Sequence, residues 1–316
     1  MDATPTSELV FAGVEAGGTS FSVGLARGSA ESIFARANFP TTTPDETIGR
    51  VVAWLREQNA KTPFHALGIA SFGPVDLDRA SPTYGYITTT PKPDWGNVDV
   101  LSRFSEFNVP TAFETDVNAP AVAHLAQFGQ PSCAYITVGT GVGVGIAVEG
   151  KPVHGLLHPE MGHIFVRMAK GDDFEGTCPF HGGLRRGTRG QSCVGQAVRR
   201  GADGSVGRRE EWDHVAYYLA QLCAALVLTV SPHRIVMGGG IMQRPTILPL
   251  VHKHVLALLN GYIKVPAITE SGIGNYITLS PFGGNAGLVG ACELARLALP
   301  TTRLLRSNAG VVQREH

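Results

Sequence analysis

A strand, a glycine-rich turn and a second strand occur twice in this chain, about 125 residues apart. The first copy spans residues 8–25, and its turn lies at residues 16–19. The second copy spans residues 133–148, and its turn lies at residues 139–143. The repetition indicates an internal duplication. It predicts an α/β protein of two similar lobes with a cleft between them and a boundary near Asn118.

Both turns have the composition of a phosphate-binding loop. Glycine lets backbone amides approach phosphate oxygens, and threonine hydroxyls add hydrogen-bond donors. Neither turn is a Walker motif, and neither leads into a helix as a dinucleotide-binding fingerprint would. An ordinary hairpin is the alternative for either turn taken alone. The candidate residues are Ala16, Gly17, Gly18 and Thr19 in the first turn and Gly139, Thr140, Gly141 and Gly143 in the second.

A third glycine cluster follows the apolar strand predicted at residues 234–237. Gly238, Gly239 and Gly240 would let a flat base approach the backbone, because none of them carries a side chain. A plain turn from a strand to a helix explains the same residues.

Composition excludes several classes of protein. The chain has 316 residues, its formal net charge is zero, and only 16% of its residues are charged, which argues against nucleic acid or an anionic membrane as the main partner. Five scattered cysteines do not indicate a disulfide framework. The N-terminus lacks the pattern of a secretory signal, and the apolar run at residues 219–230 is too short to span a bilayer. We expect a soluble, cytoplasmic protein.

The remaining elements alternate between strands and helices. Apolar runs predict strands at residues 66–71 and 111–116, and a helix at 44–58 with Thr43 as its cap and Glu46 completing a capping box. The predicted lobes are residues 1–118 and 119–285. Further helices are expected at residues 119–128, 215–230 and 286–298, the last returning to the first lobe, before a flexible tail at 299–316.

Asp116 is the candidate general base. It lies at the end of a predicted strand and at the proposed boundary between lobes, where a carboxylate can take a proton from a substrate hydroxyl. The alternative is that Asp116 only caps the helix expected to begin near residue 119.

The segment from His154 to His181 combines two kinds of chemistry. Glu160 precedes His163 by three residues, and Cys178 and His181 follow as a Cys-x-x-His pair. A carboxylate can bind sugar hydroxyls, and one cysteine with two histidines provides three metal ligands.

Taken together, these residues make the chain resemble the ROK family of sugar kinases, and its fructokinase branch in particular. The resemblance covers residues 10–292, and its most specific pieces are residues 13–19, 72–78, 81–93, 95–99, 114–119 and 154–163. It implies a two-lobed, actin-like ATPase fold of the ribonuclease H type with a zinc-binding loop at residues 163–195. It also implies phosphorylation of D-fructose to fructose 6-phosphate by ATP with Mg²⁺, in a homodimer.

The resemblance also implies residue roles. Asp116 would be the general base, and Asn97, Glu160 and His163 would bind the sugar. The two glycine turns would hold the ATP phosphates, and Gly238, Gly239 and Gly240 the adenosine. His163, Cys178 and His181 would be three of four ligands of a structural Zn²⁺.

The sequence departs from the family pattern at two places. Ser20 stands where a lysine is usual after the first turn, which removes a cation near the phosphates. Leu184 stands where the fourth zinc ligand belongs, and the glutamate that follows in the pattern is absent. Codons for residues 184–190 exist that encode Cys-Val-Glu-Gly-Leu-Ala when read one nucleotide out of frame. We therefore hypothesise a local frameshift that closes near Val194, which a gene sequence without such codons would exclude.

Two other functions remain open. The chain could phosphorylate a related hexose such as mannose or glucose, or bind sugar and nucleotide with impaired catalysis because residues 184–193 are altered. A repressor of the same family is not expected, since the first predicted strand begins within ten residues and leaves no room for a DNA-binding helix-turn-helix.

Overall fold

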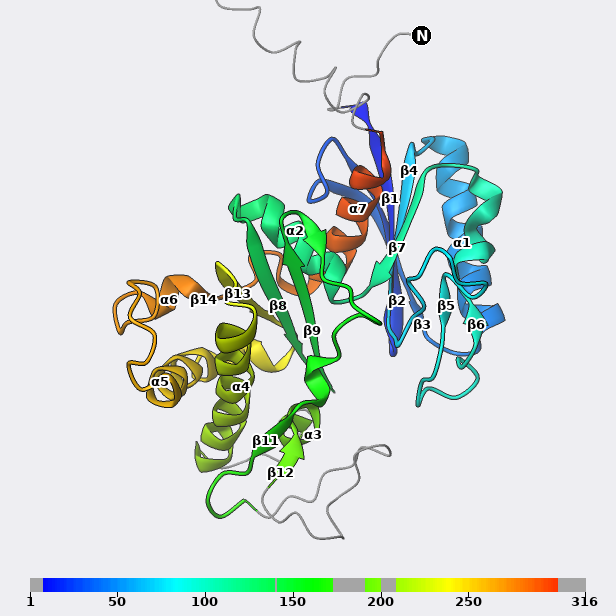
Figure 1. Cartoon of the computed structure of the whole chain (residues 1–316). Coiled ribbons are helices and arrows are strands. Elements are labelled where there is room, and N and C mark those ends of the chain that lie inside the picture. The colour runs from blue at the N-terminus through cyan, green and yellow to red at the C-terminus, as the bar shows by residue number, and fades with distance from the viewer. Residues whose placement is uncertain (1–7, 140, 173–190, 200–208, 301–316) are drawn as a thin grey trace, which may run out of the picture. The chain divides into compact units, whose positions relative to one another are not determined.

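The computed structural model describes residues 8–139, 141–172, 191–199 and 209–300. These residues form two units, coloured along the chain in Figure 1. The first unit takes its residues from 1–123, 154–158 and 285–316, and the second from 124–153 and 159–284. The sequence indicated one continuous second lobe. In the structure, the short segment 154–158 belongs instead to the first unit, and the first change of unit lies between Ala123 and His124.

The first unit contains a five-stranded sheet in the order β3-β2-β1-β4-β7. β2 (Ser20–Arg27) runs antiparallel to its two neighbours, β1 (Val10–Ala16) and β3 (Ile33–Pro40), whereas β4 (Ala66–Ser71) and β7 (Thr111–Thr115) continue the sheet parallel to β1. All six residues of β4 are buried, as expected for a parallel strand with both faces covered.

The second unit repeats this topology in the order β10-β9-β8-β13-β14. β8 (Ser132–Val138), β9 (Val142–Val148) and β10 (Lys151–Pro152) form the antiparallel part, and β13 (Arg234–Gly238) and β14 (Ile277–Leu279) lie parallel to β8. Equal strand order and direction in the two sheets confirm the internal duplication.

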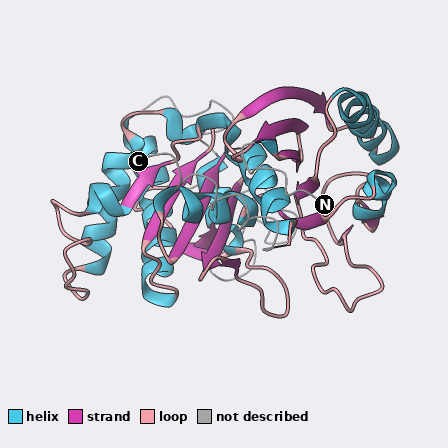
Figure 2. Ribbon diagram, turned by 90° about the horizontal axis from the view of Figure 1, so that it is seen from above, coloured by secondary structure: helices cyan, strands magenta, loops and turns pink. Residues whose placement is uncertain are grey.

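Helices complete both units, and Figure 2 shows them in cyan beside the magenta strands. The long helices are α1 (Pro44–Lys61), α2 (Asn118–Phe128), α4 (Arg209–Thr229), α5 (Ile247–Leu259) and α7 (Ala286–Ala298), with short ones at α3 (Val194–Arg199) and α6 (Ile273–Tyr276). The remaining short elements are β5 (Tyr86–Ile87), β6 (Val98–Asp99), β11 (Phe165–Arg167), β12 (Gln191–Cys193), and the 3₁₀ turns η2 (Leu101–Phe107), η3 (Met161–His163), η4 (Ile241–Gln243) and η5 (Gly283–Asn285). Among the described residues, no helix is both long and apolar enough to cross a membrane.

The capping box predicted for α1 is wrong in its first member. Thr43 is the N-cap residue but makes no side-chain capping bond. The preceding Thr42 bonds side chains of the first turn instead, since its hydroxyl donates to Glu46 Oε2 at 2.6 Å and its amide donates to Thr47 Oγ1 at 2.9 Å. The sequence pattern identified the helix start and missed which threonine is bonded.

Helix α7 packs on the first sheet through glycine contacts. A Cβ added at Gly68 in β4 would lie 1.9 Å from the backbone oxygen of Ala291, and one added at Gly13 in β1 would lie 2.7 Å from Cys292 Sγ. Ten of the thirteen helix residues are buried. The sheet and the helix backbone therefore approach more closely than any side chain would allow.

Candidate active site

The first glycine turn is the loop of the β1–β2 hairpin. Within it, the amide of Gly17 donates to the carbonyl of Ser20 at 3.1 Å, and Thr41 closes over the loop by donating to the carbonyls of Gly17 and Thr19. Gly18 and Thr19 are exposed, and a Cβ added at Gly18 would meet no atom within 4 Å. In this conformation, Gly18 and Thr19 are thus better placed than Gly17 to donate to a phosphate.

The second glycine turn is the loop of the β8–β9 hairpin. The amide of Gly139 donates to the carbonyl of Gly141 at 2.9 Å, and Gly141 is exposed with open space at its Cβ position. Gly143 is already part of β9, where it pairs with Thr137. Thr140 lies outside the described residues.

The third glycine cluster has a packing requirement of its own. A Cβ at Gly238 would lie 2.6 Å from the hydroxyl of Tyr135, and Gly239 has a left-handed φ of +89° with its Cβ position 2.4 Å from the carbonyl oxygen of Val138. Only Gly240 is exposed with nothing near its Cβ position. Packing at the turn between β13 and η4 therefore explains why Gly238 and Gly239 are glycines, without a bound nucleotide.

Asp116 follows the last residue of β7. Its backbone amide donates to the carbonyl of Ser71 at 2.9 Å, which continues the β4–β7 ladder by one residue, and the residue is half-buried. The hydroxyl of Thr115 accepts a hydrogen bond from the amide of Asn118 at 2.9 Å. The peptide that carries the candidate base is thus held on both sides by bonds to neighbouring residues.

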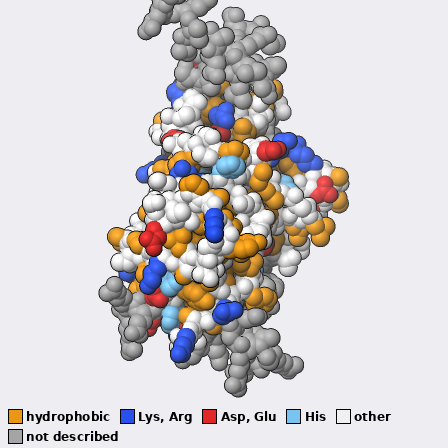
Figure 3. All heavy atoms as spheres, turned by 60° about the vertical axis from the view of Figure 1, so that its left-hand side comes forward, with side chains coloured by type: hydrophobic (Ala, Val, Ile, Leu, Met, Phe, Trp, Pro, Cys, Tyr) orange, Lys and Arg blue, Asp and Glu red, His pale blue; other side chains and the backbone are white. Residues whose placement is uncertain are grey.

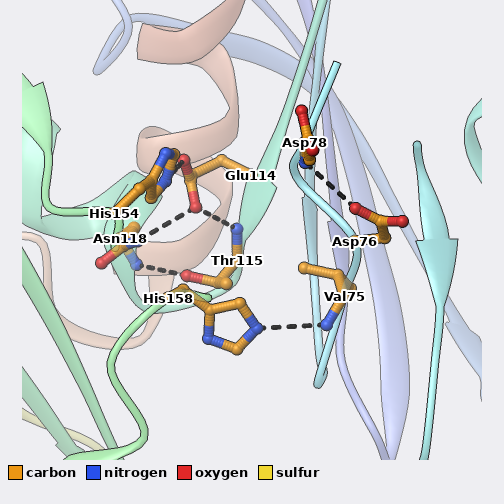
Figure 4. Close-up of polar contacts among 8 residues, drawn as sticks. All are labelled: Val75, Asp76, Asp78, Glu114, Thr115, Asn118, His154 and His158. Atoms are coloured by element: carbon orange, nitrogen blue, oxygen red, sulfur yellow. Dashed lines mark hydrogen bonds and ion pairs between the residues drawn. The ribbon is translucent and has the colours of Figure 1, made fainter. Parts of the chain in front are cut away.

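A buried carboxylate, Glu114, lies two residues before Asp116, and its side chain points toward His154 and Asn118 (Figure 4). Glu114 is 3% exposed, and its Oε1 accepts hydrogen bonds from the amide of Thr115 at 2.9 Å and from Asn118 Nδ2 at 3.0 Å. Its Oε2 lies 2.7 Å from His154 Nε2. The hydrogen bond to Glu114 is the main cause that raises the pKa of His154, and this favours the imidazolium form.

The predicted sugar-binding residue Asn97 lies in an exposed turn of the first unit. Its φ is +59°, a left-handed conformation that asparagine tolerates, and its amide donates to the carbonyl of Thr88 at 3.1 Å. Nearby along the chain, the Asp76 carboxylate accepts the hydroxyls of Ser81 and Thr83 at 2.5 and 2.6 Å, and these bonds lower the pKa of Asp76. These hydrogen bonds to the Asp76 carboxylate therefore stabilise the loop formed by residues 76–84.

Glu160 and His163 lie together at the 3₁₀ turn η3 of the second unit. Glu160 precedes the turn, and its carbonyl accepts the amide of His163 at 2.9 Å. Both residues are exposed, although surrounding protein atoms partly desolvate the Glu160 carboxyl and raise its pKa. Gly162 permits the turn to sit against β9, since a Cβ there would lie 1.9 Å from the carbonyl oxygen of Val142.

The predicted zinc ligands are only partly described. Cys178, His181 and the substituted position Leu184 lie outside the described residues, which leaves His163. In the part of the chain that the structure describes, no group of three potential ligands forms a metal site.

Sequence reasoning missed Glu114 and His154 as members of this site. Glu114 carries a visible signal, because it is a charged residue among the buried residues at the end of β7. His154 carries no such signal, since its partner is 40 residues away in the sequence.

Glu15, on β1 next to the first turn, was also missed. Its carboxyl lies against the start of α7, where a Cβ at Gly287 would meet Glu15 Oε1 at 2.0 Å. Burial raises the pKa of Glu15 to about 7, while hydrogen bonds from Ser22 and the Leu288 backbone partly oppose this. The protonated form is thus favoured in the folded chain.

This raised pKa predicts that stability falls as the pH rises. Between the unfolded pKa of 4.5 and the folded value of about 7, the folded chain binds more protons, so the free energy of unfolding decreases through this window and stays lower above it. Replacing Glu15 by glutamine should remove about 2 kcal/mol of this decrease, allowing for partial exposure of the residue. Urea unfolding from pH 5 to pH 8.5 measures the effect. Equal pH dependence in both proteins would contradict it.

Comparison with known proteins shows the family of this chain. The ROK family matches residues 11–298. The chain belongs to the ROK family. A protein named fructokinase from Zymomonas mobilis is 40% identical over 303 residues, covering 92% of this chain and 97% of that protein. Another of that name from Lactococcus lactis is 37% identical, covering 83% and 89%. The resemblance predicted from the sequence is confirmed.

Solved structures of ROK proteins share the fold. A ROK glucokinase from Streptomyces griseus, solved with glucose and AMPPNP, superposes with a TM-score of 0.68 at 23% identity and covers 91% of this chain and 99% of that one. A ROK hexokinase from Thermus thermophilus gives 0.66 at 22% identity, covering 92% of this chain and 98% of that one. The predicted α/β, actin-like ATPase fold is confirmed by these neighbours.

Proposed function

We propose that this ROK protein is an ATP-dependent fructokinase that converts D-fructose to fructose 6-phosphate. The observation that carries the proposal is the high identity, over most of the chain, to several proteins named fructokinase from different bacteria. A glucokinase of the same family is only 24% identical over a similar share of the chain, which favours fructose over glucose. Location in the cytoplasm and assembly as a homodimer are part of this proposal and rest on the family resemblance.

In the proposed reaction, Asp116 takes the proton of the fructose hydroxyl that attacks the γ-phosphorus of Mg-ATP. The support is its place at a strand end, half-buried, on a peptide bonded on both sides. Phosphoryl transfer depends mainly on positioning and charge neutralisation, so a rigid base is what this chemistry requires. Asn97, Glu160 and His163 are proposed to bind the sugar, and the turn residues 16–19, 139–143 and 238–240 to bind ATP.

We also propose a structural Zn²⁺ held by His163, Cys178 and His181. The donor set fits the metal, because zinc in structural sites is bound by cysteine and histidine. His163 is the last residue of η3 and is exposed, so it lies at the surface of the second unit. When bound, zinc would fix the orientation of the His163 ring. With leucine at position 184 the shell would have three protein ligands and bind metal more weakly.

The experiment is a comparison of this chain with a variant of its altered loop. The variant carries Leu184→Cys, Arg185→Val, Arg186→Glu, Thr188→Leu and Arg189→Ala, which restores the family pattern around the unchanged Gly187. We expect fructose-dependent ADP formation with Mg-ATP and one bound zinc in the variant, and weaker zinc binding and lower turnover in this chain. Equal activity and zinc content would show that the fourth ligand and the glutamate are dispensable. No turnover in either protein would exclude the fructokinase.

A second candidate is a kinase of a modified hexose. A protein named kanosamine kinase from Amycolatopsis mediterranei is 30% identical and covers 89% of this chain. The same ADP assay with mannose, glucose and an amino sugar distinguishes this candidate from the fructokinase. The candidate requires that one of these sugars gives a higher kcat/KM than fructose.

A further inference from the structure

Two histidines hold the segment 154–158 on the first unit. His154 pairs with Glu114 of β7, and His158 Nε2 accepts the backbone amide of Val75 at 3.1 Å (Figure 4). Since the ring nitrogen of His158 accepts, the proton of that ring is on Nδ1. Between the two histidines, the amide of Gly155 donates to the carbonyl of Leu157 at 2.9 Å, which folds the segment into a tight turn. By connectivity, this segment directly precedes Glu160.

The pair between His154 and Glu114 is unequal in burial. The side chain of Glu114 is 5% exposed and that of His154 is 40% exposed. A buried carboxylate without hydrogen bonds and a counter-charge is costly, and Glu114 has three donors that satisfy it. Two of these donors are neutral groups of β7 and α2, whereas the His154 ring carries a positive charge when it is protonated. Removing His154 would leave the buried carboxyl group with two of its three hydrogen-bond donors.

The same carboxylate also braces the peptide of Asp116. Glu114 Oε1 bonds the amide of Thr115 on one side of Asp116 and the side chain of Asn118 on the other. The Asn118 amide in turn bonds the hydroxyl of Thr115. These bonds form a closed frame around residues 115–118, and His154 joins the frame from outside β7 and α2 through its bond to Glu114.

We propose that His154 is a positioning residue for Asp116, acting through the buried Glu114. Its imidazole fixes the Glu114 carboxylate, and the carboxylate fixes the peptide that carries the base. This inference rests on the proposed role of Asp116 in the fructokinase reaction. The alternative is that His154 only stabilises the fold by neutralising a buried charge, and the two roles differ in what they change.

The test is a kinetic cycle with Asp116, carried out in whichever of the two loop versions has the higher turnover. His154→Ala, His154→Gln and Asp116→Asn are compared singly and as His154→Ala with Asp116→Asn. We expect His154→Ala to lower kcat on the order of tenfold, with the KM for fructose changed less than about threefold. Glutamine keeps an N–H donor near the same place, so His154→Gln should recover part of the loss. In the Asp116→Asn background, His154→Ala should change kcat less than about twofold.

The matched control is Arg296→Gln in α7. Arg296 donates to Glu293, another buried carboxylate of the first unit that is 4% exposed, at 2.7 Å. This variant should lower the melting temperature and leave kcat within about twofold of the parent.

Three results would overturn the inference. One is an unchanged kcat in His154→Ala. Another is that His154→Ala lowers kcat by the same factor in the parent and in the Asp116→Asn background. The third is a loss in Arg296→Gln as large as in His154→Ala, because the effect would then come from general destabilisation. If a loop version phosphorylates fructose and any of these results is found, the proposed fructokinase activity stands and only the role of His154 is overturned. If neither loop version turns over fructose, both proposals are overturned.

Discussion

Replacing Asp116 by asparagine should lower kcat for fructose phosphorylation by about 10²- to 10⁴-fold, the range that a general base contributes. Asparagine keeps the shape of the side chain and removes its ability to accept a proton. Because the two side chains have nearly the same size, the bonds among Glu114, Thr115 and Asn118 should persist in the variant, and the fold should be preserved. ADP formation under saturating fructose and Mg-ATP measures the loss.

A second carboxylate of the same unit provides the control for this loss. Asp45 is exposed in the first turn of α1 and pairs with Arg103 at 2.9 Å. Asp45→Asn should leave kcat within about twofold, since exposed ion pairs contribute little. If Asp116→Asn keeps kcat within threefold of the parent, Asp116 is not the base, and the interpretation of Asp116 as a cap of α2 becomes the better one.

Replacing Gly68 by alanine should destabilise the first unit by about 3 kcal/mol or more. The added Cβ would lie 1.9 Å from the oxygen of Ala291 and 2.7 Å from the amide nitrogen of Ala295, and both atoms belong to the backbone of α7. No side-chain rotation can relieve such a contact, so the helix must shift on the sheet. Denaturant unfolding, followed at a fixed pH, measures the change.

Gly49 in α1 offers the matched control for this substitution. It is an exposed helical glycine, and a Cβ added there would meet no atom within 4 Å. Gly49→Ala should therefore stabilise the chain by about 0.5 to 1 kcal/mol, the difference in helix propensity. Equal effects of the two substitutions would mean that α7 does not press on β4 as described.

Local sequence patterns were sufficient to predict the helices and strands that have a clear run or period of apolar residues. The two strand–turn–strand copies, the buried strand β4 and the helix α7 were predicted with bounds that match or nearly match the structure. The same patterns put Asp116 at a strand end. Each of these features depends on residues close together in the sequence, where periodicity is informative.

Other features depend on contacts that no local pattern contains. β3 was missed, because its side chains are partly or fully exposed along its whole length and give no buried run. The return of residues 154–158 to the first unit depends on pairs separated by 40 and 83 residues. The roles of Gly238 and Gly239 were undecided from sequence, since only the structure shows Tyr135 and Val138 against them.

The distribution of charge on the surface is another feature that composition does not determine. On the face in Figure 3, basic and acidic side chains lie scattered among apolar and uncharged ones. The low content of charged residues argued only against nucleic acid or an anionic membrane as the main partner, and composition cannot say where the charges lie.

The packing of α7 on β1 and β4 also bears on how the chain is made. The first sheet is complete in sequence by Thr115, yet the helix that covers it begins only at Ala286. A ribosome adding about 5 to 20 residues per second needs on the order of ten seconds or more to cover that distance. During this interval α7 is not yet available to cover the face of β1 and β4 that carries Gly13 and Gly68. The packing of α7 on the first sheet is therefore a late event in synthesis, although the strands of that sheet leave the ribosome before those of the second unit.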